Sequence, residues 1–544
     1  MDIKTVLNKI TIISIPLVII SFSPFISYDP FNISKFFTLS LFGTILGTLI
    51  LMQFSYLKQS KEKWIIFLSI IFIFWSFISL VFSPINLLDG LFGLPGRHTG
   101  VLTYLFLSIY FIAILLNSNY NSSIKLVRVL YFTALLAMTY GYIQSFGLDP
   151  VNWSSPPPAA FSFFGNQNFL SAFIGIVAVS GIGLLFSKST KKELKFLILL
   201  FTILSLVLMS FTNSTQGYLI FTAGFAVILL IWLRLHEQLA KFFWLIFGFF
   251  ILVGVVVIFD LLQKTPWPSF LYEPSVSARG DFWRAAWRMS IENPIFVVGL
   301  DGFVDHYRLS RDLAATTRGS AIRTDSAHNI FLELLSGGGF PLLLIFICIV
   351  ILVCKYSIQY IKNSENFDPI HSGLFAAWIA FMVQTTISIN QISLAITGWI
   401  LSGALIGYQG KFEKVVKSNK SKIGLKNFLV IFLAIIFGLG IGTPPMLVDA
   451  KFREAIVNSD ADLLIDISDN WPMNSYRLST IGGVLRLNGY PQEAIEVLRK
   501  GIDFNPNHFE TWREFYLCPG ITESDKLLAE SKLKVLDPFG FGAS

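Results

Sequence analysis

The sequence predicts an all-α, polytopic membrane bundle of about 13 spans, with a large outer loop and a small C-terminal helical-repeat domain. The 544 residues are 54% hydrophobic and only 14% charged, which is too apolar for a soluble globular protein of this size. Apolar segments of roughly 20 residues, the length of a bilayer crossing, recur along most of the chain. The net charge of +7 resides largely in the loops between these segments. It therefore indicates membrane topology and no nucleic-acid partner.

The spans are placed where apolar residues run without interruption. The first run follows Lys4 and Lys9, as in a signal peptide, but it lacks a small-x-small cleavage site and further spans follow it. We therefore expect a retained first helix. The predicted spans are 11–27, 34–54, 64–83, 101–117, 124–146, 169–187, 195–211, 215–233, 242–260, 329–354, 373–389, 391–408 and 427–443.

Lysines and arginines are distributed unevenly between alternate loops, and this predicts the orientation. Lys58, Lys61 and Lys63 lie in one inner loop, and six lysines from Lys411 to Lys426 lie in another. Short loops with such an excess of positive charge stay on the cytoplasmic side. The loop at about 261–327, and everything after about Gly442, are then expected to face outward.

The tail, residues 444–544, changes composition abruptly as charged residues return. Pro472, Pro506 and Pro538 are spaced by 34 and 32 residues, and apolar and small residues between the first two follow the pattern of a tetratricopeptide repeat. The tail is thus predicted to be an extracytoplasmic stack of helical hairpins, separate from the membrane domain at 1–443. It would either bind a protein partner or cap the membrane domain, and we expect few contacts across the boundary.

Metal and cofactor sites are not predicted. The three cysteines, Cys348, Cys354 and Cys518, are scattered and form neither a disulfide framework nor a metal-binding cluster. The outer loops contain no paired carboxylates with metal-binding spacing. The spans contain almost no ionisable residue near their centres, which argues against an ion-driven carrier.

The 261–327 loop is the predicted location of an active site, because it is the longest polar interval between the spans. Seven arginines lie between Arg279 and Arg323. Within it, Ser277–Glu292 is predicted to be a short helix, which places Arg284 and Arg288 on one face. A guanidinium group offers a planar fork of donors that suits phosphate oxygens. The alternative is an interfacial helix whose arginines contact only bulk phospholipid.

His328 stands where this loop re-enters the membrane, in the segment TDSAHNIFLELLSGGGFP. An imidazole at this depth could act as a base, although a lone histidine is more often a packed or hydrogen-bonded residue. The run Gly337–Gly339 would weaken a helix there or allow a neighbour to pack closely.

These segments together resemble the O-antigen ligase and O-antigen polymerase family, and the related bacterial O-linked oligosaccharyltransferases. The resemblance rests on the order of SARGDFWRAAW at Arg279, NPIFVVGLDGF, and AHNIFLELLSGGGFP at His328. GLPGRHTG around Arg97 and FFGNQNFLSAF around Asn166 and Asn168 also fit. It covers about residues 30–410.

The resemblance implies a donor glycan on undecaprenyl diphosphate, attacked by an acceptor hydroxyl at the outer face of the bacterial cytoplasmic membrane without metal or cofactor. Arg279 would then lie near the diphosphate, and His328 would be the base or would position the acceptor. One departure is Gln216, in NSTQG, where family members often carry an arginine. Either another arginine, such as Arg284 or Arg323, supplies that charge, or the diphosphate is held differently. The substrate-binding candidates are Arg97, Arg284, Arg288, Arg323, Asn166, Asn168, Gln216 and Asn329.

The predicted function is therefore glycan transfer by an integral membrane glycosyltransferase. Its partners would be membrane lipid, a lipid-linked glycan donor, and a glycan or protein acceptor. The sequence does not choose between a lipid-anchored core glycan, a growing lipid-linked polymer and a protein hydroxyl. Two other classes stay open: a transporter or flippase of lipid-linked glycan, and a non-enzymatic scaffold whose tail recruits a protein partner.

Overall fold

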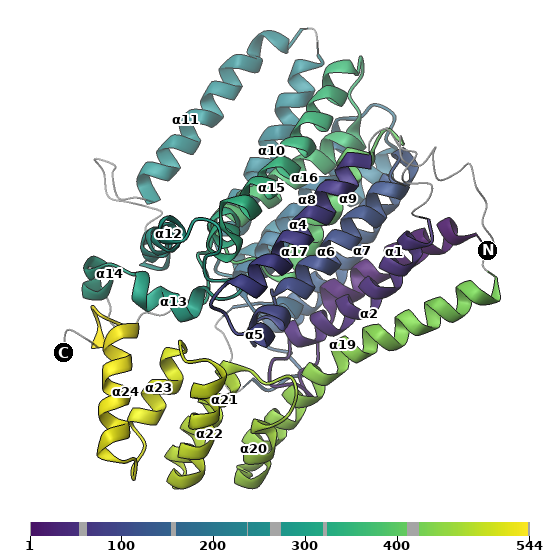
Figure 1. The fold of residues 1–544 in the computed structure, drawn as a ribbon. Helices are drawn as coiled ribbons and strands as arrows, with labels where there is room; N and C mark the ends of the chain where they lie inside the picture. Colours follow the sequence, from purple (N-terminus) through teal and green to yellow (C-terminus); the bar gives the residue numbers. More distant parts are fainter. Residues whose placement is uncertain are drawn as a thin grey trace.

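The computed structural model describes residues 2–53, 63–153, 159–236, 238–261, 274–318, 324–410 and 424–541. Every element in these ranges is a helix (Figure 1). Ten of the described helices are long and apolar enough to cross a membrane. Three shorter apolar helices, Val101–Asn117, Ala240–Val256 and Ile392–Gly407, coincide with further predicted spans. The all-α membrane bundle is confirmed, and the total of 13 spans stays a prediction.

Most of the long helices lie side by side in one bundle, and α11 Phe243–Leu261 is set apart at its edge, next to α10 (Figure 1). The predicted first span, 11–27, is misplaced: α1 begins at Ile3, because Asp2 caps it by accepting from Thr5 N, and it ends at Ile20 before Pro24. The bundle helices are α1 Ile3–Ile20, α2 Asn32–Leu51, α4 Lys63–Phe82, α6 Val101–Asn117, α7 Tyr120–Ser145, α8 Gln167–Phe186, α9 Lys192–Phe211, α10 Gln216–Arg234, α11 Phe243–Leu261, α15 Ile330–Asn363, α16 Pro369–Ile387, α17 Ile392–Gly407 and α19 Leu425–Asn458.

The helices differ in how much of their surface they bury. In α17 every residue is buried, and α6 is nearly as enclosed, so these two short helices form the centre of the bundle. In contrast, α9, α11 and α19 expose many leucine and phenylalanine side chains. A helix that is apolar on all sides yet exposed is stable only against lipid.

Short helices gather at one end of the bundle, together with the C-terminal tail (Figure 1). We call this the tail end of the bundle. The predicted helix Ser277–Glu292 is confirmed as α12, which begins three residues earlier, at Pro274. The short elements at this end are α5 Leu87–Phe92, η1 Ser162–Phe164, α12 Pro274–Glu292, α13 Phe303–Ser310 and α14 Leu313–Arg318, whereas η2 Ala240–Phe242 lies at the opposite end, before α11.

The predicted weak point at Gly337–Gly339 is a break in α15. Gly339 has φ of 72°, and a Cβ added there would lie 2.3 Å from the carbonyl oxygen of Ile295. Only glycine therefore allows the chain after α12 to pack this closely. The carbonyl groups released by the break are bonded again, because Ser79 Oγ donates to Gly337 O at 2.9 Å and Trp75 Nε1 to Gly338 O at 2.8 Å.

The tail continues from α19 without interruption, since this helix runs through Pro444 and Pro445 to Asn458. The composition change at 443/444 therefore falls inside one helix. Helix α19 packs on α2 through Gly438 and Gly442, where added Cβ atoms would lie 2.3 and 2.5 Å from the hydroxyls of Thr44 and Ser40. The tail helices that follow are α20 Ala461–Ser468, α21 Ser475–Leu487, α22 Pro491–Phe504, α23 Phe509–Tyr516 and α24 Glu523–Leu536.

The tail helices form antiparallel pairs around their own apolar core, as expected of helical hairpins. Assignment of these hairpins to the tetratricopeptide class stays a prediction. The expectation that few contacts cross to the membrane domain is wrong. Asn474 Nδ2 donates to Asp89 in α5 at 2.7 Å, and Arg311 at the end of α13 lies 2.8 Å from Asp537. These contacts are buried, so the tail is docked on the tail end of the bundle.

Candidate active site

Two motifs that lie 200 residues apart in sequence are joined at the tail end of the bundle. Asp301, in the GLDGF segment, accepts hydrogen bonds from Leu94 N at 3.2 Å, Thr99 N at 3.1 Å and Thr99 Oγ1 at 2.6 Å. The carboxylate thus accepts the hydrogen bonds that buried backbone N–H groups of the LPGRHTG loop would otherwise donate to water. This clamp fixes the loop that carries Arg97.

Arg97 is buried, with 6% of its surface exposed, among three carboxylates. Its Nη2 lies 3.2 Å from Glu333 and 3.7 Å from Asp301, and its Nη1 lies 3.8 Å from the carboxylate of Asp325. Nη1 also donates to the backbone carbonyl of Asp325. A guanidinium held in this way positions the surrounding segments, because its donors are directed at protein groups.

The segment that leads to His328 is held from both sides. Glu333, in the first turn of α15, accepts from Ala327 N at 2.9 Å with the carboxylate that also binds Arg97. His328 itself has a φ of 54°, the left-handed region that non-glycine residues seldom adopt. Residues held in such a conformation are concentrated at functional sites.

The imidazole of His328 has a defined orientation. Its Nδ1 lies 3.2 Å from the carbonyl oxygen of Ser326, and its ring packs at 5.4 Å against that of Phe282 in α12. A carbonyl oxygen can only accept, so this contact favours a proton on Nδ1 and leaves the lone pair on Nε2. Among the described residues, no hydrogen-bond partner is found for Nε2. Burial lowers the pKa of His328 to about 4, and the charges of Arg279 and Arg97 act in the same direction.

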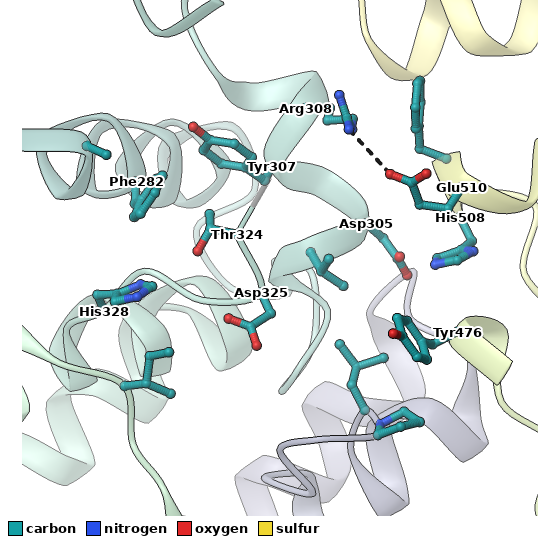
Figure 2. A pocket seen from close by; sticks show the side chains of 16 residues that line it. Phe282, Asp305, Tyr307, Arg308, Thr324, Asp325, His328, Tyr476, His508 and Glu510 are labelled. Atoms are coloured by element: carbon teal, nitrogen blue, oxygen red, sulfur yellow. Dashed lines mark hydrogen bonds and ion pairs between the residues drawn. The ribbon is translucent and has the colours of Figure 1, made fainter. Parts of the chain in front are cut away.

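His328 lines a cavity of about 510 Å³ (Figure 2). Figure 2 shows His328 and Phe282 at one side of this cavity, and Tyr476 and His508 of the tail at the other. The volume lies in the range of small-molecule sites, roughly 300–1,000 Å³. The lining residues are Leu94, Pro95, Ala278, Phe282, Val304, Asp305, Tyr307, Arg308, Thr324, Asp325, His328, Ile389, Tyr476, His508, Phe509 and Glu510.

The arginines of α12 fall into two groups. Arg279 lies beside Ala278, which lines the cavity, and its charge acts on His328. Arg284 and Arg288 instead both pair with Asp312, at 2.9 and 3.4 Å. The side chains of these two are 48% and 39% exposed. Of the α12 arginines, only Arg279 is thus brought to His328.

The remaining candidates do not line this cavity. Asn166 caps α8 by accepting from Asn168 N at 2.8 Å, and Asn168 accepts from Ser214 Oγ at 2.6 Å. Gln216 is buried beside them at the start of α10, and its Nε2 has no partner among the described residues. Asn329 caps α15 by accepting from Phe331 N at 3.0 Å. Arg323 lies outside the described residues.

Sequence reasoning did not identify several residues of the site. Asp301 lies within NPIFVVGLDGF and Asp305 two residues after it, and their spacing is typical of neither a metal site nor an acid–base pair. Asp325 lies within the segment that contains His328, three residues before the histidine. The tail residues Tyr476 and His508 carried no local signal at all, because only the docking of the tail brings them to the cavity.

The fold and the site define a multi-pass membrane protein with a buried charge cluster and a histidine-lined cavity at one end of its bundle. Residues 198–347, which include α12, α13 and His328, match the family model described as O-antigen ligase. The match supports the resemblance to the O-antigen ligase family, and that family implies a glycosyltransferase-type enzyme with a lipid-linked glycan donor and a glycan acceptor. No curated protein matches the chain.

Proposed function

We propose that the protein transfers a glycan from a polyprenyl-diphosphate-linked donor to an acceptor hydroxyl, with His328 as the general base. The observation that carries this proposal is the position of His328 in a cavity of the domain that matches the O-antigen ligase family. The reaction forms a bond between the anomeric carbon and the acceptor oxygen. It breaks the bond between that carbon and the diphosphate, which leaves with the polyprenyl chain.

The acceptor proton goes to Nε2 of His328. The contact of Nδ1 with the Ser326 carbonyl favours the tautomer in which Nε2 carries the lone pair. Because burial lowers the pKa of His328, the imidazole is neutral at physiological pH and can take up the proton. Arg97 and Glu333 act as positioning residues, since both hydrogen-bond to the segment before His328.

The leaving diphosphate gains negative charge as the glycosidic bond breaks. A preorganised guanidinium group stabilises such charge without reorganisation of solvent. Arg279 is the best-placed candidate, because it is the α12 arginine whose charge acts on His328. The charge of Arg279 would make a metal ion unnecessary at this step. The proposed orientation, with the tail end of the bundle outside the cytoplasmic membrane, follows from the lysine-rich loops at the opposite side.

Product analysis with His328→Ala tests this function. Purified full-length protein is supplied with a lipid-linked glycan and candidate acceptors, and the joined product is quantified. His328→Ala should lower the transfer rate by roughly 10²–10⁴-fold, the usual contribution of a positioned base. His328→Gln keeps a hydrogen-bonding side chain but cannot act as a base at neutral pH, so it should be equally impaired in rate.

The matched control is His236→Ala, because His236 packs on Trp232 at the end of α10, away from the cavity. This variant should transfer glycan at the normal rate. A well-folded His328→Ala protein with wild-type transfer would remove His328 from the mechanism. If wild-type protein moved the lipid-linked glycan across vesicles without joining it to an acceptor, the enzyme assignment itself would fail.

A further inference from the structure

The cavity at His328 has two walls that come from different parts of the chain. One wall belongs to the membrane domain and carries His328, Asp325 and Phe282. The other belongs to the tail, where Tyr476 at the start of α21 faces the same space (Figure 2). Phe509 at the start of α23 also lines it. The tail is therefore part of the cavity and does more than cover it.

Buried polar contacts hold the tail wall in place. Asp537, which is 2% exposed, lies 3.1 Å from Arg308 and 2.8 Å from Arg311. Asn505 Nδ2 donates to Asp305 in α13 at 2.8 Å. Groups that are desolvated in this way require their partners, so they fix the register between α13 and the tail.

The lining has the chemistry of a sugar-binding site. Asp305, Asp325 and Glu510 offer carboxylate oxygens that accept from hydroxyl groups, whereas Tyr476 and Phe509 offer ring faces for the C–H side of a pyranose. Arg308 is the one arginine among the lining residues, and Asp537 and Glu510 neutralise it at 3.1 and 3.3 Å. The tail side of the cavity therefore disfavours a diphosphate, which the proposed function places near Arg279, and it suits a neutral, hydroxyl-rich ligand.

Asp305 gives the most specific indication of a ligand. It is 6% exposed, and its Oδ1 has no hydrogen-bond partner among the described residues, whereas Oδ2 is bonded to Asn505. A buried polar atom without a partner is costly, and its place on the cavity wall means that a ligand hydroxyl could supply the missing bond.

We infer that the tail forms half of an acceptor subsite for a sugar, in which Asp305 and Tyr476 select the acceptor glycan and present its hydroxyl to His328. The inference rests on the proposed function and makes it more specific, because the acceptor is then a glycan and not a protein side chain. Asp305 and Tyr476 are binding residues and take no proton in the reaction.

Saccharide binding to the full-length protein tests this subsite separately from catalysis. Saturation-transfer NMR with a panel of free hexoses, N-acetylhexosamines and their disaccharides measures binding without a donor. Wild type and His328→Ala should bind the same saccharides, although only wild type transfers glycan. Asp305→Asn and Tyr476→Ala should weaken binding about tenfold or more, as expected for one lost hydrogen bond or ring contact.

In transfer assays, the same two variants should raise KM for the acceptor and leave KM for the donor unchanged. Tyr476→Phe keeps the ring and should bind more tightly than Tyr476→Ala. Tyr490→Ala is the matched control, since Tyr490 is similarly exposed on the tail (43% against 38%) and does not line the cavity. Wild-type saccharide binding by Asp305→Asn and Tyr476→Ala would overturn the inference. So would binding of serine-containing peptides in place of saccharides, or displacement of the saccharides by inorganic pyrophosphate.

If His328→Ala transferred normally while the saccharide-binding results held, only the proposed catalytic role would fail. The two claims are thus separable by experiment.

Discussion

Arg97 Nη2 lies 3.2 Å from Glu333 Oε1, an ion pair that joins residues 236 positions apart in the sequence. The same arginine donates to the Asp325 carbonyl, and the same glutamate accepts from Ala327 N at 2.9 Å. The segment between these two contacts leads directly into His328. One buried pair therefore determines where the imidazole stands.

Removing the arginine of this pair should destabilise the protein. Arg97→Gln would leave Glu333 and Asp301 buried without their counter-charge, and the free energy of unfolding should fall by about 3–5 kcal/mol. Thermal unfolding in detergent measures this loss. The double variant Arg97→Gln, Glu333→Gln should recover part of it, and Arg234→Gln, at an exposed position on α10, should have no effect. Equal unfolding temperatures for Arg97→Gln and wild type would contradict the structural role.

The pH dependence of transfer should reflect the buried imidazole. The base must be neutral to accept a proton, so activity is retained above the pKa of His328 and lost as the pH falls through it. Burial lowers this pKa from the ordinary value of 6.5, so the acid limb of kcat/KM should have its midpoint well below 6.5. A profile from pH 8 down to well below pH 4 measures it. A midpoint at or above 6.5 would be incompatible with the buried base.

Replacement by lysine should affect transfer activity differently at the two α12 arginines Arg279 and Arg288. Arg279→Lys keeps the charge but loses the planar fork, and we expect transfer to fall by roughly 10²-fold, as for the loss of one preorganised donor. Arg288→Lys is the matched control on the same helix, because Arg288 is 39% exposed and pairs with Asp312. It should retain nearly full activity. If both Arg279→Lys and Arg279→Ala behaved as wild type, the diphosphate role of Arg279 would be abandoned.

The docked tail should be required for transfer. Asp537→Asn removes the charge that neutralises Arg308 and Arg311, and we expect the tail to detach while the membrane helices stay folded. Limited proteolysis should then cut the tail faster, and transfer should fall in parallel. Asp469→Asn is the control, since its pair with Lys500 lies on the tail surface with the Asp469 side chain 65% exposed. Normal protease resistance and normal transfer by Asp537→Asn would refute this requirement.

The predicted orientation can be mapped by cysteine labelling in a background without Cys348, Cys354 and Cys518. Single cysteines at Lys61, Lys191 or Lys417 should react only after the membrane is permeabilised, because lysine-rich loops stay in the cytoplasm. A cysteine at Lys532, which is exposed on α24, should react in intact cells. A protected tail would mean that the number of spans is even.

The sequence alone determined the membrane bundle and most of its helix positions. A bilayer crossing requires a local run of apolar residues of a certain length, and such a run can be recognised in the sequence without knowing which helices pack against it. The helix at Ser277–Glu292 and the break at Gly337–Gly339 were also predicted, because caps, prolines and glycines act over a few residues. The first span was misplaced for the same kind of reason, since the cap at Asp2 was overlooked.

Only the tertiary structure decided which polar groups meet. Arg97 was predicted as a substrate-binding residue, but it is buried against Glu333, whereas Arg284 is engaged by Asp312. No sequence pattern predicted that Tyr476 lines the cavity. It does so because Asp537 and Asn505 dock the tail on α13. Ion pairs join groups that lie hundreds of residues apart in the sequence, so no local sequence pattern predicts them. The length of the apolar runs therefore determines where the chain crosses the membrane, and long-range ion pairs determine which residues line the cavity at His328.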